Sequence, residues 1–465
     1  MSNYKIETKC IQSGYEPGNG EPRVLPIYQS TTFKYNSSDQ MGRLFALEES
    51  GYFYTRLQNP TNDAVAAKIC DLEGGVAAML TSSGQAANFY AIMNICEEGD
   101  HIVCASALYG GTYNLYAHTI KKMGIDATFV DPECTTEELN AAFKENTKAV
   151  FGETIANPAL VVLDLEKFAA AAHAHGVPFI VDNTFATPVN CRPFEWGADI
   201  VTHSTTKYMD GHATCVGGAI VDSGNFDWAA HADKFPGLTT PDETYHGIVY
   251  TEKFGKAAYI TKATSQLMRD LGSIPSPQNS FILNLGLETL PLRVERHCEN
   301  ALAAAKYLEK TFGTPYEVTY PIVEELVPDM DYLGKKILIV HQQVIGNAMR
   351  AEIRRRCQKV DGDPSVDNNA VITVASWFMM KQELSEKGDI SLREEDDYME
   401  LIKEEDYDIV FADPMMKRMT EDAYKMAGTG CVADAYETKR KRIFIDATHF
   451  AVSGKLREEM KKREA

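Results

Sequence analysis

A lysine and an aspartate of this 465-residue chain each stand at the end of a short apolar run. Asp182 closes the run Phe179–Asp182. Lys207 comes shortly after a second run, Ile200–His203, with a serine and two threonines in between. A lysine amine can attack a carbonyl carbon, a carboxylate can hold a proton on a ring nitrogen, and small hydroxyls can bind phosphate. Together these groups would suit carbonyl chemistry on a phosphorylated aromatic ring.

Pyridoxal 5'-phosphate (PLP) is a cofactor that needs this combination. Lys207 could form a Schiff base with its aldehyde, and Asp182 could keep a proton on its pyridine nitrogen, so that the ring accepts electrons. Ser204 and Thr206 could donate hydrogen bonds to its phosphate. The same spacing also fits a surface lysine and an aspartate that caps a helix, and spacing alone does not choose between the two interpretations.

Three further segments carry groups that could bind such a cofactor. In SSGQAAN, Gly84 and Gln85 open a helix after a strand, where backbone N–H groups point at an anion. In YTRLQNPT, Arg56 could form paired hydrogen bonds to phosphate and Tyr54 could add a phenol. Tyr109 follows a strand end, where its ring could lie on a planar cofactor. Each segment taken alone also fits an ordinary turn, a charged loop or a core tyrosine.

Short apolar runs alternate with helical stretches from about residue 60 to residue 225. This pattern predicts a mostly parallel seven-stranded sheet with helices on both faces. Ligands bind beyond the carboxyl ends of the strands in such sheets, which is where Asp182 and Lys207 would lie. The expected strands are Ala77–Leu80, His101–Ala105, Ala127–Val130, Ala149–Gly152, Phe179–Asp182, Ile200–His203 and Gly218–Val221.

A second α/β pattern begins beyond residue 330 and predicts a separate C-terminal Rossmann-like α/β domain. Its expected strands are Lys336–Val340, Ala370–Val374, Asp408–Phe411 and Arg442–Ile445, and its expected helices are Ala348–Arg356 and Pro414–Met426. The predicted organisation is an N-terminal arm (1–60), a PLP-binding domain (61–312), a linker (313–333) and the C-terminal domain (334–465).

The composition argues against several function classes. A formal net charge of −20 disfavours a nucleic-acid surface, which needs clustered lysine and arginine. No apolar run could span a bilayer, and MSNYKIETKC lacks the apolar core of a signal peptide, so we expect a cytoplasmic protein that binds no membrane. The ten cysteines include no CxxC pair, and no metal site is predicted.

The order of the motifs resembles the PLP enzymes of cysteine and methionine metabolism, the cystathionine γ-synthase-like transferases and lyases of fold type I. The matching segments run from about Tyr4 to about Leu308 and include YTRLQNPT, SSGQAAN, ALYGGTYN, ETIANP, VDNTFATP and GADIVTHSTTKYMDGH. Within that family, VDSGNFDW, KFPGLTTPDETYHG, RDLG and GLETLPLRVERHCENA are similar to the O-acetylhomoserine sulfhydrylase branch. That branch usually has a glycine at the position of Ala213.

The resemblance implies a role for each matching residue. Lys207 would bind the cofactor and later carry a proton, and Asp182 would bind the pyridine nitrogen. Tyr109 would stack on the ring and assist the leaving group, and Asn157 would lie beside the phenolic oxygen of PLP. The phosphate would be bound by Gly84, Gln85, Ser204 and Thr206 and, from a neighbouring subunit, by Tyr54 and Arg56. The active unit would therefore be a dimer, and the usual assembly a dimer of dimers.

The implied reaction is γ-replacement, in which O-acetylhomoserine and sulfide, or methanethiol, give homocysteine, or methionine, and acetate. A γ-lyase of sulfur amino acids in the same fold is one alternative. Another is a PLP- or ligand-binding fusion protein with little turnover, because the C-terminal part lacks the family's motif for the arginine that binds the substrate carboxylate. The surroundings of Arg442 do not match that motif. Residues from about Tyr332 to Leu456 instead resemble a Rossmann-like unit of nitrogenase component 1-type proteins.

Overall fold

The chain forms two compact units, Met1–Glu299 and Asn300–Ala465, in a computed structural model. Each unit contains a seven-stranded sheet. The division between them falls inside helix α14 (Leu290–Phe312), ahead of the predicted linker. Residues 313–325 of that linker lie outside the described residues, which are 4–312, 326–341, 343–361, 370–377, 380, 384–392, 395–417, 419–420, 424–425, 435–438 and 441–447.

The sheet of the first unit has the strand order β1-β7-β6-β5-β4-β2-β3. Strands β3, β2, β4, β5 and β6 run parallel, whereas β7 is antiparallel to both β1 and β6. The sheet is therefore mostly parallel, as the sequence predicts, and every strand overlaps a predicted run. The strands are β1 (Ala77–Thr81), β2 (His101–Ala105), β3 (Asp126–Val130), β4 (Thr147–Glu153), β5 (Phe179–Asp182), β6 (Ile200–His203) and β7 (Gly218–Asp222).

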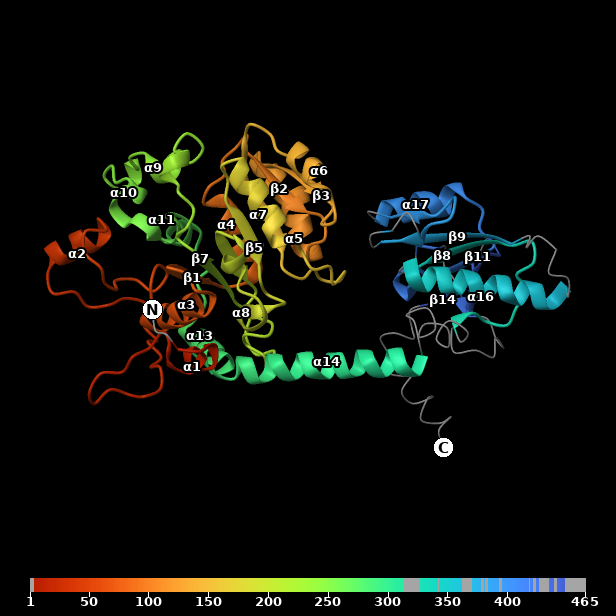
Figure 1. The fold of residues 1–465 in the computed structure, drawn as a ribbon, viewed down its shortest axis with the longest axis horizontal. Coiled ribbons are helices and arrows are strands. Elements are labelled where there is room, and N and C mark those ends of the chain that lie inside the picture. The colour runs from red at the N-terminus through yellow and green to blue at the C-terminus, as the bar shows by residue number, and fades with distance from the viewer. Residues whose placement is uncertain are drawn as a thin grey trace. The chain divides into compact units, whose positions relative to one another are not determined.

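Helices cover both faces of this sheet, because neighbouring strand residues point to opposite sides. Met79 and Ile220 belong to an apolar cluster with α4 and α11, whereas Leu80 and Val221 pack with α3 and α13 (Figure 1). This arrangement confirms the predicted fold class. The helices are α1 (Ile6–Gln12), α2 (Ser38–Phe45), α3 (Pro60–Glu73), α4 (Gly84–Met93), α5 (Gly110–Asn114), α6 (Thr136–Ala141), α7 (Leu165–Ala174), α8 (Thr187–Asn190), α9 (Pro236–Thr239), α10 (Tyr250–Phe254), α11 (Ala258–Lys262), α12 (Arg269–Leu271) and α13 (Pro277–Glu288), with α14 shared between the units.

The second unit also has helices on both faces of its sheet. In β8, Ile337 and Ile339 pack with α16, whereas Leu338 and Val340 pack with α17 (Figure 1). The strand order is β10-β9-β8-β11-β14-β13-β12, and the first five of these strands are parallel. The elements are β8 (Lys336–Val340), α16 (Gln343–Asp361), β9 (Val371–Ser376), β10 (Ile390–Ser391), α17 (Glu395–Glu404), β11 (Ile409–Ala412), β12 (Tyr424–Lys425), β13 (Ala435–Glu437) and β14 (Ile443–Asp446).

One predicted element of this unit is wrong. The expected helix Pro414–Met426 is replaced by a 3-10 turn, Pro414–Lys417, and by strand β12. β12 pairs antiparallel with β13, which in turn pairs with β14. By pairing at the sheet edge, β12 and β13 satisfy each other's backbone N–H and C=O groups. The helical pattern in the sequence does not reveal this partner strand, and tertiary pairing overrides helix propensity.

Candidate active site

Three parallel strands bring the predicted reactive residues to one edge of the first sheet. The register pairs Glu153 at the end of β4 with Asp182 at the end of β5, and pairs Asp182 with Thr202 of β6. The chain leaves β6 at His203 and reaches Lys207 in a turn, in which the Lys207 amide donates to the Ser204 carbonyl over 3.3 Å. The carboxyl ends of the strands therefore place an acid and an amine at the same edge of the sheet.

A cavity of about 780 Å³ lies at these strand ends. Eight of the ten residues predicted to bind the cofactor line it: Gly84, Gln85, Tyr109, Asn157, Asp182, Ser204, Thr206 and Lys207. Tyr54 and Arg56 are not among its lining residues. Tyr54 forms an isolated β-bridge with Thr32, and Arg56 is exposed.

Asp182 is held by hydrogen bonds from both sides. Thr184 donates to Oδ1 of Asp182 from its backbone amide over 3.0 Å and from its hydroxyl over 2.5 Å. The Ser204 amide donates to the same Thr184 hydroxyl over 2.7 Å, which links β5 to the segment that carries Lys207. Asn88 Nδ2 donates to Oδ2 of Asp182 over 3.2 Å. The carboxylate is thus fixed in place against the floor of the cavity.

Asn88 and Glu153 line the cavity but were not predicted from the sequence. Asn88 belongs to the SSGQAAN motif, and Glu153 opens ETIANP at the end of β4. Both residues therefore lie within motifs that carry the family resemblance. Glu153 accepts hydrogen bonds from the backbone amides of Tyr109 (2.7 Å) and Asn157 (3.3 Å). Burial, together with the charge of nearby Asp182, raises the pKa of Glu153 to about 8. The raised pKa favours the protonated form of Glu153 near neutral pH.

Lys207 is exposed in the cavity. Arg293 of α14 lines the same cavity. The guanidinium of Arg293 donates to the carbonyls of Tyr208 (2.7 Å) and Gly286 (2.7 Å). It thereby ties the turn that follows Lys207 to the end of α13.

The phosphate end of the cavity is tightly built. Ser83 caps α4 by accepting from the Ala86 amide over 3.1 Å, and Gly84 is the first residue of that helix. A Cβ on Gly84 would lie only 2.5 Å from the Cβ of Ser204, so only glycine allows this approach. The helix N-terminus and the Ser204 hydroxyl can donate hydrogen bonds to an anion. The Thr206 hydroxyl, in the same cavity, donates to the Gly217 carbonyl over 3.2 Å. With Asp182, Tyr109 and Lys207 in the same cavity, the residues present fit PLP.

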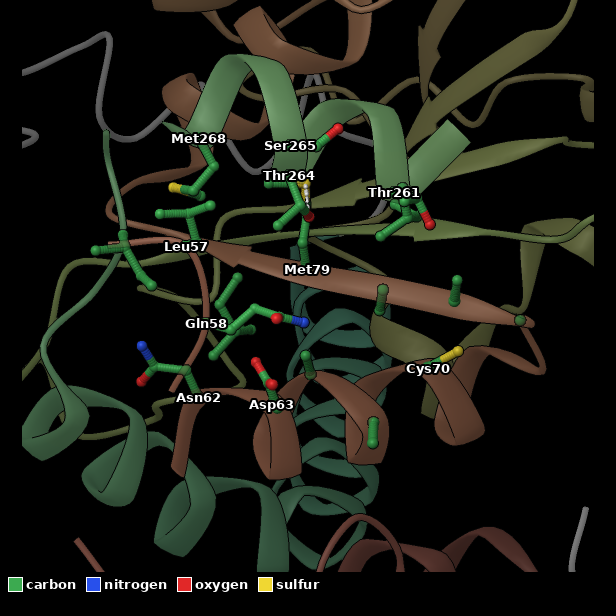
Figure 2. Close-up of a pocket in the computed structure, with 18 of the residues that line it drawn as sticks. Leu57, Gln58, Asn62, Asp63, Cys70, Met79, Thr261, Thr264, Ser265 and Met268 are labelled. Carbon is green, nitrogen blue, oxygen red and sulfur yellow. Dashed lines mark hydrogen bonds between the residues drawn. The ribbon is translucent and has the colours of Figure 1, made fainter. Parts of the chain in front are cut away.

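A second cavity, of about 520 Å³, lies between α3, β1 and the π-helical segment η7 (Ala263–Met268) (Figure 2). Figure 2 shows Asp63 below Gln58. The Thr264 hydroxyl lies 4.0 Å from the sulfur of Met79. None of the described residues that line it is a lysine, arginine or histidine. It therefore has neither an amine for a Schiff base nor a cation for phosphate.

A family described as Cys/Met metabolism PLP-dependent enzyme matches residues 7–355. The chain belongs to this family. The match confirms the predicted resemblance, the predicted enzyme class and the predicted cofactor, and it extends past the limit near Leu308 that the motifs suggested. The similarity of the C-terminal part to nitrogenase component 1-type proteins stays a prediction.

Curated relatives agree with the family. The homocysteine/cysteine synthase of Saccharomyces cerevisiae is 48% identical over 322 residues, which cover 68% of this chain and 72% of that protein. The homocysteine synthase of Schizosaccharomyces pombe is 47% identical over 335 residues, covering 72% and 77%. The O-acetyl-L-homoserine sulfhydrylase of Leptospira meyeri is 44% identical over 317 residues, covering 66% and 71%.

Solved structures share the fold of this PLP-enzyme family. A Campylobacter jejuni protein named as an O-acetylhomoserine (thiol)-lyase superposes with a TM-score of 0.64 at 36% identity, covering 66% of this chain and 76% of its own, and carries a pyridoxyl-lysine phosphate group. A cystathionine γ-lyase from Lactobacillus plantarum has a TM-score of 0.54 at 32% identity, with coverage of 66% and 69%. Both likenesses support the predicted fold class.

Proposed function

We propose that this chain catalyses PLP-dependent γ-replacement, in which O-acetylhomoserine and sulfide, or methanethiol, give homocysteine, or methionine, and acetate. The observation that carries the proposal is the single cavity in which Lys207, Asp182 and Tyr109 meet, in a chain whose relatives are homocysteine synthases and O-acetylhomoserine sulfhydrylases. The bond between Cγ and the acetyl oxygen breaks and a bond between Cγ and sulfur forms. Acetate leaves with the electron pair, so no oxidant or reductant is needed.

The chain's own groups divide the work of this reaction. PLP, when bound, supplies a ring that takes up electrons from the substrate's α-carbon. Lys207 holds the cofactor and then moves protons at the carbon atoms of the substrate. Asp182, oriented by Thr184 and Asn88, holds a proton at the ring nitrogen. Tyr109, whose backbone amide is fixed by Glu153, presents its ring to the cofactor and its phenol to the leaving group.

The substrate carboxylate has no assigned arginine. Arg293 is the one arginine among the described residues that line the cavity, and its guanidinium already donates to backbone carbonyls and to the Thr289 hydroxyl. Arg442 is buried in the second unit, where it donates to the Tyr407 carbonyl over 2.8 Å. This observation favours a second candidate function, a PLP-binding chain with little turnover, because a bidentate clamp does much of the positioning of a substrate.

The test is a visible absorption spectrum of the purified chain combined with a product assay. We expect a band of the lysine-linked cofactor and, after addition of O-acetylhomoserine and sulfide, formation of homocysteine. Lys207→Ala should abolish the band, whereas Lys121→Ala, which removes an exposed lysine of the same unit, should keep it. A Lys207→Ala variant that keeps the band would refute the site. A band without product would favour the low-turnover candidate, and a 2-oxo acid with ammonia would favour a γ-lyase.

We further propose that Tyr54 and Arg56 complete the cavity of a neighbouring copy, in a dimer that assembles into a dimer of dimers. The placement of both residues outside their own cavity supports this. Sedimentation of the purified chain tests it, and a monomer that binds PLP fully would contradict it. No helix in the described part of the chain is long and apolar enough to cross a membrane. A cytoplasmic location stays a prediction.

A further inference from the structure

A buried cluster of hydrogen-bonded polar side chains lies next to the strand ends that carry the candidate active site. Glu73, the last residue of α3, and His203, the last residue of β6, have side chains that are 0% and 1% exposed. Nε2 of His203 lies 2.6 Å from Oε1 of Glu73. Nδ2 of Asn183 donates to the same oxygen over 2.9 Å. Burying polar groups this completely is unfavourable unless their hydrogen bonds are all made, so the cluster is weak evidence for a role in stability alone.

The cluster joins the three strands whose ends form the cavity. The Thr154 hydroxyl, just beyond β4, donates to Oδ1 of Asn183 over 2.8 Å. Asn183, just beyond β5, donates its backbone amide to the Thr202 carbonyl of β6 over 2.9 Å. Thr154, Asn183 and His203 are each the sequence neighbour of a cavity residue, and Glu73 joins the cluster through its contacts with Asn183 and His203. A displacement of the cluster must therefore pass directly to Glu153, Asp182 and Ser204.

Two atoms of the cluster show that it is not optimised for hydrogen bonding. Oε2 of Glu73 and Nδ1 of His203 are buried and have no hydrogen-bond partner in the described part of the chain. Such unsatisfied groups are rare in folded proteins and each requires an explanation. A buried, incompletely satisfied polar cluster at this place points to a role in holding the geometry of the strand ends.

We propose that Glu73 is a positioning residue that holds the ends of β4, β5 and β6 together and so sets the separation between Asp182 and Lys207. The proposal rests on the assignment of PLP to the Lys207 cavity. Without the Glu73 carboxylate, His203 Nε2 loses this partner, and Asn183 Nδ2 keeps only the Cys191 carbonyl at 2.8 Å. Leaving a buried donor unsatisfied is unfavourable, and a shift of the strand ends would relieve it.

The chain offers a matched control at the opposite ends of the same two strands. Oδ2 of Asp199 accepts a hydrogen bond from the Phe179 amide at the start of β5 over 2.9 Å. The same oxygen lies 2.8 Å from Nε2 of His173. Asp199 is 2% exposed and immediately precedes β6, but it does not line the cofactor cavity. Its loss therefore removes a comparable buried carboxylate without disturbing the strand ends at the site.

The experiment is a titration of the PLP-free full chain with PLP, followed by the absorption band of the lysine-linked cofactor. Glu73→Ala is expected to raise the dissociation constant of PLP by about tenfold, equivalent to about 1.4 kcal/mol, and to shift the absorption maximum. Glu73→Gln, which keeps an oxygen for His203 and Asn183, should restore the affinity to within about threefold of the unaltered chain. Asp199→Ala should lower the thermal midpoint while leaving PLP affinity and the spectrum unchanged.

Several results would overturn the proposal. One is a folded Glu73→Ala variant with unaltered affinity and spectrum, and another is an Asp199→Ala variant that weakens PLP binding as much as Glu73→Ala. If Glu73→Ala does not fold, His203→Asn replaces it as the test variant, because an asparagine side chain is too short to reach Glu73. The expected results are the same. The PLP titration does not depend on catalysis. If the unaltered chain shows a normal band but forms no homocysteine, only the γ-replacement is refuted. If the unaltered chain shows no band, the site and this proposal are refuted together.

Discussion

Replacing Gly84 with alanine is expected to weaken PLP binding by about tenfold or more. A Cβ at this position would lie 2.5 Å from the Cβ and 2.8 Å from the Cα of Ser204, distances that force the start of α4 away from the segment leading to Lys207. Overpacking of this kind costs about 1–3 kcal/mol. Both Gly84 and Ser204 line the cofactor cavity, so we expect the cost to appear in PLP binding, where about 1.4 kcal/mol is a factor of ten.

The assay is equilibrium titration of the PLP-free variant, with Gly110→Ala as the control. Gly110 opens α5 beside Tyr109, and a Cβ on it would meet nothing within 4 Å. Gly110→Ala therefore makes the same substitution near the same cavity without a clash. The PLP affinity of this variant should stay within about threefold of the unaltered chain. A Gly84→Ala variant that binds PLP as tightly as the unaltered chain would refute the reasoning, as would an equal loss in Gly110→Ala.

Three further changes test other features of the first unit. Ala213→Gly should stabilise it by up to about 1 kcal/mol, because Ala213 has a φ of +56°, and a lower thermal midpoint would contradict this. Burial raises the pKa of Asp222 from 3.8 to about 7. Between about pH 4 and pH 7 the folded unit therefore keeps a proton that the unfolded chain releases, so the free energy of unfolding falls as pH rises through this range. Asp222→Asn should flatten the decline of the unfolding free energy with pH, as measured by denaturant unfolding. An unchanged slope of unfolding free energy against pH would contradict this expectation. Arg56→Ala should weaken PLP retention about tenfold or more through loss of a charge-assisted hydrogen bond, and unchanged retention on dialysis would argue against a shared phosphate site.

The sequence by itself was sufficient for the strands and the family, and for the sheet edge at which the proposed reactive pair lies. Apolar runs of strand length are local features, and parallel sheets bury them on both faces, so their positions could be predicted residue by residue. Asp182 ends one such run and Lys207 stands just beyond another, which predicts that both lie at the same sheet edge. The glycine expected in place of Ala213 also has a local cause, since the backbone there is left-handed.

Only the tertiary structure decided which side chains meet. Asn88 reaches Asp182, Glu153 holds the amides of Tyr109 and Asn157, and Arg293 is occupied by carbonyls of the Lys207 turn. These contacts join segments far apart in the chain. They depend on strand order and helix packing, which no local pattern encodes. The same reason accounts for the edge strand β12, where pairing with β13 replaced the predicted helix, and for the cluster of Glu73 and His203, whose members are separated by 130 residues in the sequence.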